Sequence, residues 1–92
     1  MRNSHLHQTH GEIVKRLKRA RGHLETVIDM IENGRECLDL AQQLHAVEKA
    51  IANAKRTLIH DHLDHCLEHS VGGRRGAASS SVREFKEITK YL

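Results

Sequence analysis

The stretch that decides the fold is residues 36–69, which read ECLDLAQQLHAVEKAIANAKRTLIHDHLDHCLEH. Apolar residues recur in it at alternating four- and three-residue steps, which is the spacing of one face of an α-helix. They are Leu40, Leu44, Val47, Ile51, Ala54 and Leu58. A helix of this length would span roughly 50 Å, far more than the core of so short a chain can cover. We therefore expect it to pair with a second chain.

Another amphipathic helix is expected over residues 10–33. The same four-three steps connect Ile13, Leu17, Ala20, Leu24, Val27 and Ile31. The sequence Thr9-His10-Gly11-Glu12 matches the capping box that begins many helices, and Asn33-Gly34 is a stop signal. Residues 1–8 before this helix are expected to form a mobile arm that carries two histidines.

The C-terminal part of the chain predicts a linker followed by a short helix. Residues 72–80, GGRRGAASS, are rich in glycine and serine and predict a flexible linker. Ser81-Val82-Arg83-Glu84 is a second capping-box pattern and predicts a helix over 81–92. The expected fold is all-α, a single domain over 1–92 with three helices, and no helix-turn-helix pattern is evident.

The composition excludes several classes of function. The chain has 92 residues with only two aromatic ones, so its core must be aliphatic. No long apolar run predicts a membrane span or a signal peptide, so we expect a cytoplasmic protein without a membrane partner. No nucleophile with a neighbouring base is evident, and we therefore expect neither an enzyme nor a small-molecule substrate.

Three residues of the long helix are candidate metal ligands. His62 and Cys66 are one helical turn apart, so their side chains can share one ion. Cys37 precedes them by 25 and 29 residues, which is close to seven and eight whole turns. The three side chains are therefore expected on nearly the same face. The alternative is that the cysteine is ordinary packing and the histidine only interacts with the helix dipole.

These ligands cannot meet within one straight helix. Residues Cys37 and His62 would be about 37 Å apart, whereas metal–ligand bonds are about 2.0–2.3 Å. An antiparallel partner helix would place Cys37 of one chain against His62 and Cys66 of the other. The crossing would fall near residues 50–52, among small alanines. The spacing therefore predicts a two-fold dimer with two identical sites.

The chemistry of the ligands narrows the choice of metal. Two thiolates and an imidazole exclude calcium and magnesium, and suit copper(I), nickel(II), zinc or cobalt(II). Copper(I) is satisfied by three soft ligands, whereas nickel(II) prefers four in a plane. The N-terminal histidines can supply the fourth ligand, with either His5 or His7 folding onto the site from the mobile arm.

Positive charge is concentrated early in the chain. Five of the basic residues fall within seven positions, and the long helix can extend the patch. This pattern is either a solvated helix face or a surface for double-stranded DNA. No aromatic residues interleave it, which disfavours single-stranded nucleic acid. The candidate DNA-binding residues are Lys15, Arg16, Lys18, Arg19, Arg21, Lys49 and Arg56.

At these residues the chain resembles the CsoR/RcnR/FrmR family, bacterial repressors that sense copper(I), nickel or cobalt, formaldehyde or persulfide. The resemblance covers about Gly11 to Leu92. It rests on RLKRARGHL at 16–24, on QLHAV at 43–47 and on the spacing of the candidate ligands. It implies an antiparallel dimer of helical hairpins that assembles into a flat homotetramer, which binds operator DNA and releases it when the effector binds.

The resemblance also implies a fourth ligand position, which falls on His5. The resulting His-Cys-His-Cys set is similar to that of nickel-sensing members. Copper sensors share the last three ligands but usually carry a tyrosine and a glutamate beside them, and these positions fall here on Glu36 and Arg83. Arg16 and Arg56 match DNA-contacting positions, whereas Asn53 stands where copper-sensing relatives have arginine.

The expected function is therefore a repressor that responds to nickel(II) or cobalt(II). A copper(I)-sensing repressor of the same family is the first alternative. A metal-buffering protein that does not bind DNA is an alternative from another class.

Overall fold

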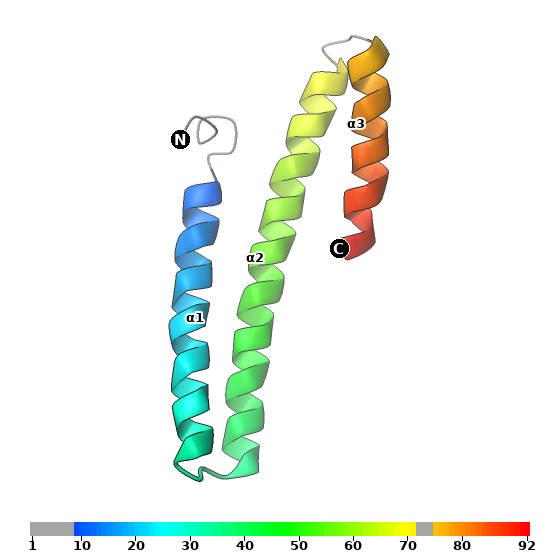
Figure 1. Ribbon diagram of the computed structural model, residues 1–92. Helices are drawn as coiled ribbons and strands as arrows, with labels where there is room; N and C mark the ends of the chain where they lie inside the picture. Colours follow the sequence, from blue (N-terminus) through cyan, green and yellow to red (C-terminus); the bar gives the residue numbers. More distant parts are fainter. Residues whose placement is uncertain (1–8, 72–74) are drawn as a thin grey trace.

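The computed structural model describes residues 9–71 and 75–92, with side chains at 9–65 and 82–92. Its helices are α1 (His10–Glu32), α2 (Cys37–Val71), α3 (Arg75–Ile88) and the short 3-10 turn η1 (Thr89–Tyr91). Helices α1 and α2 form an antiparallel hairpin, and α3 folds back along α2 on the side away from α1 (Figure 1). The described residues include no strand, so the prediction of an all-α, three-helix chain is confirmed.

The turn between α1 and α2 is closed by a glycine with a left-handed backbone. Gly34 has a φ of 77°, a conformation that side chains with a Cβ rarely adopt. Its amide donates to the carbonyl of Ile31 at 3.1 Å, and the amide of Arg35 donates to the carbonyl of Met30 at 3.0 Å. These two bonds satisfy carbonyls at the helix end, as in a Schellman motif. The predicted stop signal at Asn33-Gly34 is therefore confirmed.

Helix α1 begins at the predicted residue, but without the predicted capping box. Thr9 has a helical backbone, with φ −75° and ψ −13°, and its hydroxyl makes no capping bond. A capping side chain needs an extended backbone to reach the free amides of the first turn. The carbonyl of Thr9 accepts instead from the amide of Ile13 at 2.9 Å, so the helix simply continues through this residue.

The hairpin buries only alternate members of the two predicted apolar seams. Five of these seam residues are buried between the helices, each with at most 6% of its surface exposed: Ile13, Ala20, Val27, Val47 and Ala54. The members between them are 38–52% exposed: Leu17, Leu24, Ile31, Leu44, Ile51 and Leu58. We call these six exposed residues the apolar stripe. Helical spacing turns them to one side of the buried row on both helices, so the apolar stripe occupies one face of the hairpin.

The molecule is one helix thick. Its principal extents are 59 × 27 × 13 Å, and the smallest of them is close to the diameter of a single helix, about 10–12 Å. A single layer has no second layer against which to bury its faces. The aliphatic side chains of the apolar stripe therefore remain uncovered by the part of the chain that the structure describes. Within the described residues, no helix is both long enough and apolar enough to cross a membrane.

The predicted linker over 72–80 is wrong for its last six residues, because α3 already begins at Arg75. The prediction that helix 3 starts at residue 81 is wrong for the same reason. A single glycine in a helix costs only about 1 kcal/mol relative to alanine, and two alanines, the best helix formers, follow Gly76. Packing of α3 on α2 adds the stabilisation that local propensity does not reveal. Residues 72–74 lie outside the described part.

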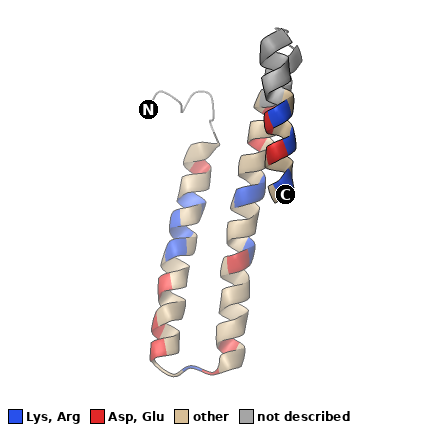
Figure 2. Cartoon of the chain, turned by 45° about the vertical axis from the view of Figure 1, so that its right-hand side comes forward, with Lys and Arg blue, Asp and Glu red and all other residues tan. Residues whose placement is uncertain are grey.

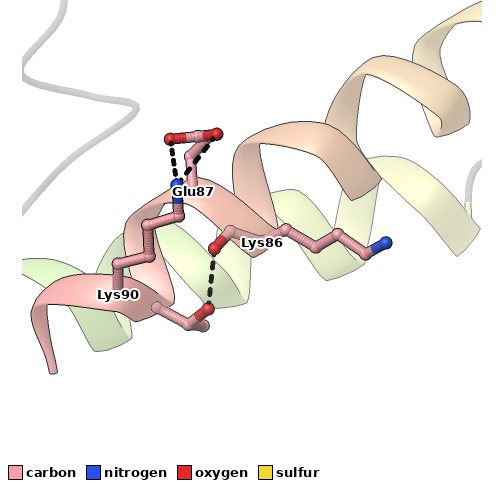
Figure 3. Close-up of polar contacts among 4 residues, drawn as sticks. Lys86, Glu87 and Lys90 are labelled. Carbon is pink, nitrogen blue, oxygen red and sulfur yellow. Dashed lines mark hydrogen bonds and ion pairs between the residues drawn. The ribbon is translucent and has the colours of Figure 1, made fainter.

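Local polar contacts order the C-terminal end of α3 (Figure 3). Lys90 Nζ lies 3.3 and 3.4 Å from the two carboxylate oxygens of Glu87, and the hydroxyl of Thr89 donates to the carbonyl of Lys86 at 2.9 Å. These groups are exposed, so the contacts stabilise the fold little. They do define how the last turn of α3 continues into η1.

Candidate metal centre and nucleic-acid interface

The candidate ligands of the core site all belong to α2. Cys37 is its first residue and is exposed, and His62 follows on the same uninterrupted helix. The separation within one chain is therefore about 37 Å, as the sequence predicts for a continuous helix. The side chain of Cys66 lies outside the described part. Among the described side chains, no three His, Cys, Asp or Glu residues are grouped so as to hold a metal ion.

The two described ligands share a face with the apolar stripe. Cys37, Leu44, Ile51 and Leu58 follow one another at steps of seven residues, which is nearly two helical turns per step. His62 follows Leu58 by four residues on the same side of α2. The ligands therefore stand at the two ends of a row of exposed aliphatic side chains.

His62 contacts a carboxylate of α3. Its Nε2 lies 3.6 Å from Oε1 of Glu84, and the two side chains are 30% and 65% exposed. They belong to the wall of a groove of about 310 Å³ between α2 and α3. The other residues of this wall are Arg83, Glu87, Ile88 and Tyr91.

This contact lies next to the position that the resemblance assigns to the glutamate of copper sensors. That position falls on Arg83, and the structure brings the carboxylate of the following residue, Glu84, to His62. The i, i+3 and i+4 spacing of Glu84, Glu87 and Ile88 was the signal that one face of this helix turns towards α2.

The N-terminal histidines remain a prediction. His5 and His7 lie outside the described residues. Their proposed contact with the metal is therefore neither supported nor contradicted by the fold.

The basic residues are exposed and lie at one end of α1. Figure 2 shows Lys and Arg in the N-terminal half of α1, with acidic residues mainly in its C-terminal half. All seven candidate DNA-binding residues are exposed. Two of them, Arg16 and Arg19, line a groove of about 370 Å³ between α1 and α2. We call this the basic groove; its other lining residues are Ala20, His23, Ala50 and Asn53.

The basic groove contains two polar residues that were not among the candidate DNA-binding residues. His23 donates through Nε2 to Oε1 of Gln43 at 2.6 Å, and so connects α1 with α2. Asn53, which stands where copper-sensing relatives have arginine, accepts at Oδ1 from the guanidinium of Arg56 at 2.7 Å. The available signal was helical spacing, because His23 follows Arg19 by one turn.

The basic groove and the apolar stripe occupy opposite faces of the hairpin. On α1, Leu17 and Leu24 turn to one side of the buried row, and Arg19 and His23 turn to the other. The same holds on α2, where Ile51 and Asn53 diverge from the row of Val47 and Ala54. The chain therefore presents an apolar face that ends in candidate metal ligands, and a polar face with arginines.

Comparison with known proteins places the chain in a family. Residues 9–92 match the model of a family described as metal-sensitive transcriptional repressors. The copper-sensing transcriptional repressor CsoR of Mycobacterium ulcerans is 41% identical over 78 residues, which are 85% of this chain and 65% of that protein. CsoR of Bacillus subtilis is 36% identical over 81 residues, 86% of this chain and 80% of that protein. No solved structure matched the chain.

The copper-sensing transcriptional repressor RicR of Mycobacterium tuberculosis is 31% identical over 70 residues, 76% of this chain and 73% of that protein. The chain thus spans slightly less than two thirds of the Mycobacterium ulcerans relative and more of the other two. All three relatives are named for copper, whereas the sequence analysis favoured nickel or cobalt. All are repressors, which agrees with the expectation that the chain is not an enzyme. With a family model that covers residues 9–92, the chain belongs to the metal-sensitive transcriptional repressors.

Proposed function

We propose that the chain is a copper(I)-responsive repressor, which binds operator DNA without metal and releases it when copper(I) binds between two subunits. The observation that carries this proposal is the position of Cys37 and His62 on one unbroken helix, on the face of the apolar stripe. An antiparallel partner that covers this stripe would bring Cys37 of one chain to His62 and Cys66 of the other. Assembly and metal binding would then use the same surface.

The donor set fits copper(I). Two cysteine thiolates and one imidazole are soft or borderline ligands, and three of them complete a copper(I) site. The similar proteins named above are copper-sensing repressors, which supports the same metal. Copper(I) therefore replaces nickel or cobalt as the leading effector.

The contact between His62 and Glu84 supports a ligand role for the histidine. Histidines that bind metals commonly direct their other ring nitrogen to a carboxylate, which orients the ring and raises its basicity. Nε2 of His62 faces Glu84 at 3.6 Å, so in this arrangement the metal would take Nδ1. The carboxylate also connects the site with α3.

The exposed apolar stripe supports the proposed assembly. Six exposed aliphatic side chains on one face of a single-layer hairpin form an apolar patch of the kind that marks a protein–protein interaction site. We propose an antiparallel dimer that pairs further into a tetramer, with the basic grooves available to double-stranded DNA. Cancelling phosphate charge by arginine releases counterions and supplies affinity without a recognition helix.

Nickel(II) or cobalt(II) remains the second candidate effector. It is favoured by the histidines of the N-terminal arm, because His5, with His7 as a possible addition, would complete a four-ligand set with the core site. Nickel(II) prefers such a set, whereas copper(I) gains little from a fourth ligand.

The test is a DNA-release titration. A labelled duplex from the region upstream of the coding sequence is bound by the metal-free protein, and copper(I), nickel(II) and cobalt(II) are added separately while anisotropy is followed. Copper(I) is expected to release the DNA at about one equivalent per chain, and a coupling of about 1–3 kcal/mol would lower DNA affinity roughly 5–150-fold. His62→Ala should bind DNA and fail to respond.

The same titration with His5→Ala and His7→Ala separates the two candidates. Copper-driven release should be unchanged in both variants. Release by nickel that depends on His5, together with no response to copper(I), would make nickel the effector. Metal binding without any DNA binding would indicate the metal-buffering class.

A further inference from the structure

The hydrogen bond between His23 and Gln43 is a directional contact in a hairpin whose buried contacts are aliphatic. It joins α1 to α2 across 20 residues of sequence, with Nε2 and Oε1 only 2.6 Å apart, and it is partly buried. The buried row of α1 consists of Ile13, Ala20 and Val27. Aliphatic contacts of this kind stabilise association but specify alignment weakly, because they are not directional.

The buried row leaves the fine alignment of the two helices weakly specified. Ile13, Ala20 and Val27 repeat every seven residues, as do Val47 and Ala54 opposite them. The short turn at residues 33–36 prevents a shift by a whole heptad, but aliphatic rows of this kind tolerate smaller shifts and rotations of one helix against the other, and a polar pair limits them. The His23–Gln43 hydrogen bond provides such a pair here.

The same histidine belongs to the basic groove. His23 lines it together with Arg16 and Arg19 from α1 and Asn53 from α2. Asn53 in turn holds the guanidinium of Arg56 at 2.7 Å. The groove therefore carries guanidinium groups from α1, and the guanidinium of Arg56 from α2 lies beside it, bonded to a lining residue. The placement of these groups relative to one another depends on how α1 and α2 are aligned.

We propose that His23 and Gln43 are positioning residues of the DNA interface, whose hydrogen bond fixes α1 against α2 so that the arginines of the two helices bind phosphates together. Phosphates in a duplex have fixed spacing, so groups on two helices can bind them simultaneously only at one alignment. Without the hydrogen bond each arginine remains present and charged, but the two sides of the groove are no longer held in one fine alignment. This inference rests on the proposed DNA-binding function.

The experiment is a double-mutant cycle on the metal-free full chain. His23→Ala, Gln43→Ala and the double variant are titrated with the upstream duplex at several salt concentrations. Each single variant is expected to bind the duplex about five- to tenfold more weakly than the wild type, which is the size of effect expected when one hydrogen bond is lost. The slope of log affinity against log salt should fall by about 1, as for one lost phosphate contact. The double variant should be no weaker than the single ones.

His45→Ala is the matched control, because His45 is an exposed histidine of α2 that does not line the basic groove. It should bind DNA like the wild type. Copper(I) affinity, sedimentation and helix content should be unchanged in every variant, which a general loss of structure would not allow. If helix content does fall in an alanine variant, His23→Gln and His23→Leu replace it. Glutamine can still donate and should restore binding, whereas leucine should not.

The outcomes separate this inference from the proposed function. If the wild-type protein binds no DNA, both are overturned. If it binds, and the single variants bind equally well or their losses add in the double variant, the His23–Gln43 inference alone is overturned. Equal binding by His23→Gln and His23→Leu would overturn it in the same way.

Discussion

The two faces of the α1–α2 hairpin are built from the same two helices but differ in the kind of contact that would stabilise them. The apolar stripe exposes aliphatic side chains that water solvates poorly, so it gains free energy only when another surface covers it. The basic groove on the other face is already solvated, and its arginines gain by exchanging counterions for phosphates. Under the proposed function, one face would take a protein partner and the other a polyanion. The predictions below test whether the two faces have separate roles, one in assembly and metal binding and the other in DNA binding.

The largest effect is expected from a charge at the centre of the apolar stripe. Ile51→Glu would place two carboxylates close to the proposed crossing of the partner helices, where burial and like-charge repulsion both oppose pairing. We expect the dimer dissociation constant to rise at least about 100-fold, and copper(I) affinity to fall with it. Sedimentation equilibrium measures the dimer dissociation constant. Gln42→Glu adds the same charge to α2 outside the stripe, and should leave the dimer intact. A dimer that survives Ile51→Glu would contradict the assignment of this face.

Subunit mixing tests whether the apolar face also carries the metal site. We expect two variants to lose copper(I) affinity by at least about 100-fold relative to the wild type, as measured by competition with a chelator. They are the Cys37→Ala chain and the His62→Ala/Cys66→Ala chain. After mixing and re-equilibration, each heterodimer should regain one tight site, because one of its two sites keeps all three ligands. If mixing restores no tight binding, the ligands do not meet across the dimer.

A smaller effect is expected on the polar face. Arg16→Ala and Arg19→Ala should each weaken DNA binding by about tenfold and lower the salt slope by about 1. Lys18→Ala is the control, because Lys18 is exposed on α1 but does not line the basic groove. Its effect should be clearly smaller, and copper(I) affinity should be unchanged in all three. Equal losses at Lys18 and the arginines would mean that DNA is bound by general charge and not by the groove.

The smallest effect is expected beside His62. Glu84→Gln keeps the size of the side chain but removes its charge, and copper(I) affinity should fall by about tenfold or less, since Glu84 is well exposed. Glu87→Gln is the control, because the Glu87 carboxylate is engaged with Lys90 one turn later in α3 (Figure 3). DNA affinity of the metal-free protein should be unchanged in both. A larger loss with Glu87→Gln would show that another carboxylate supports the histidine.

Both long helices could be predicted from the sequence. Which residues of each apolar seam are buried and which are exposed could not. The four-three steps identified Ile13, Leu17, Ala20 and Leu24 as one face of α1, which they are. Periodicity reports which side chains point the same way, and it cannot report which of them a second helix of the same chain will cover. The structure buries Ala20 and leaves Leu24 39% exposed, because a single neighbouring helix covers only half of the seam.

The candidate site was predicted in part for a related reason. Spacing along one helix is readable from the sequence, so the shared face of Cys37 and His62 could be predicted. Contacts between helices depend on how the helices are rotated and how they cross. Spacing along one helix indicates which face a residue occupies, but it does not indicate that Glu84 meets His62 or that Gln43 meets His23. The start of α3 was missed because glycines at 72–76 outweighed the two alanines that follow them.

Helix α2 continues for 35 residues without a break, and this gives the molecule a mechanical property. A rod of about 52 Å converts a tilt of one degree at one end into a displacement of about 1 Å at the other. His62 lies near one end of this rod, Cys37 lies at the other, and Asn53 stands between them. A ligand that reorients one end therefore moves the groove residues without any loop having to fold. The speed of such a response would be set by rigid-body rotation of helices, which belongs to the microsecond–millisecond range.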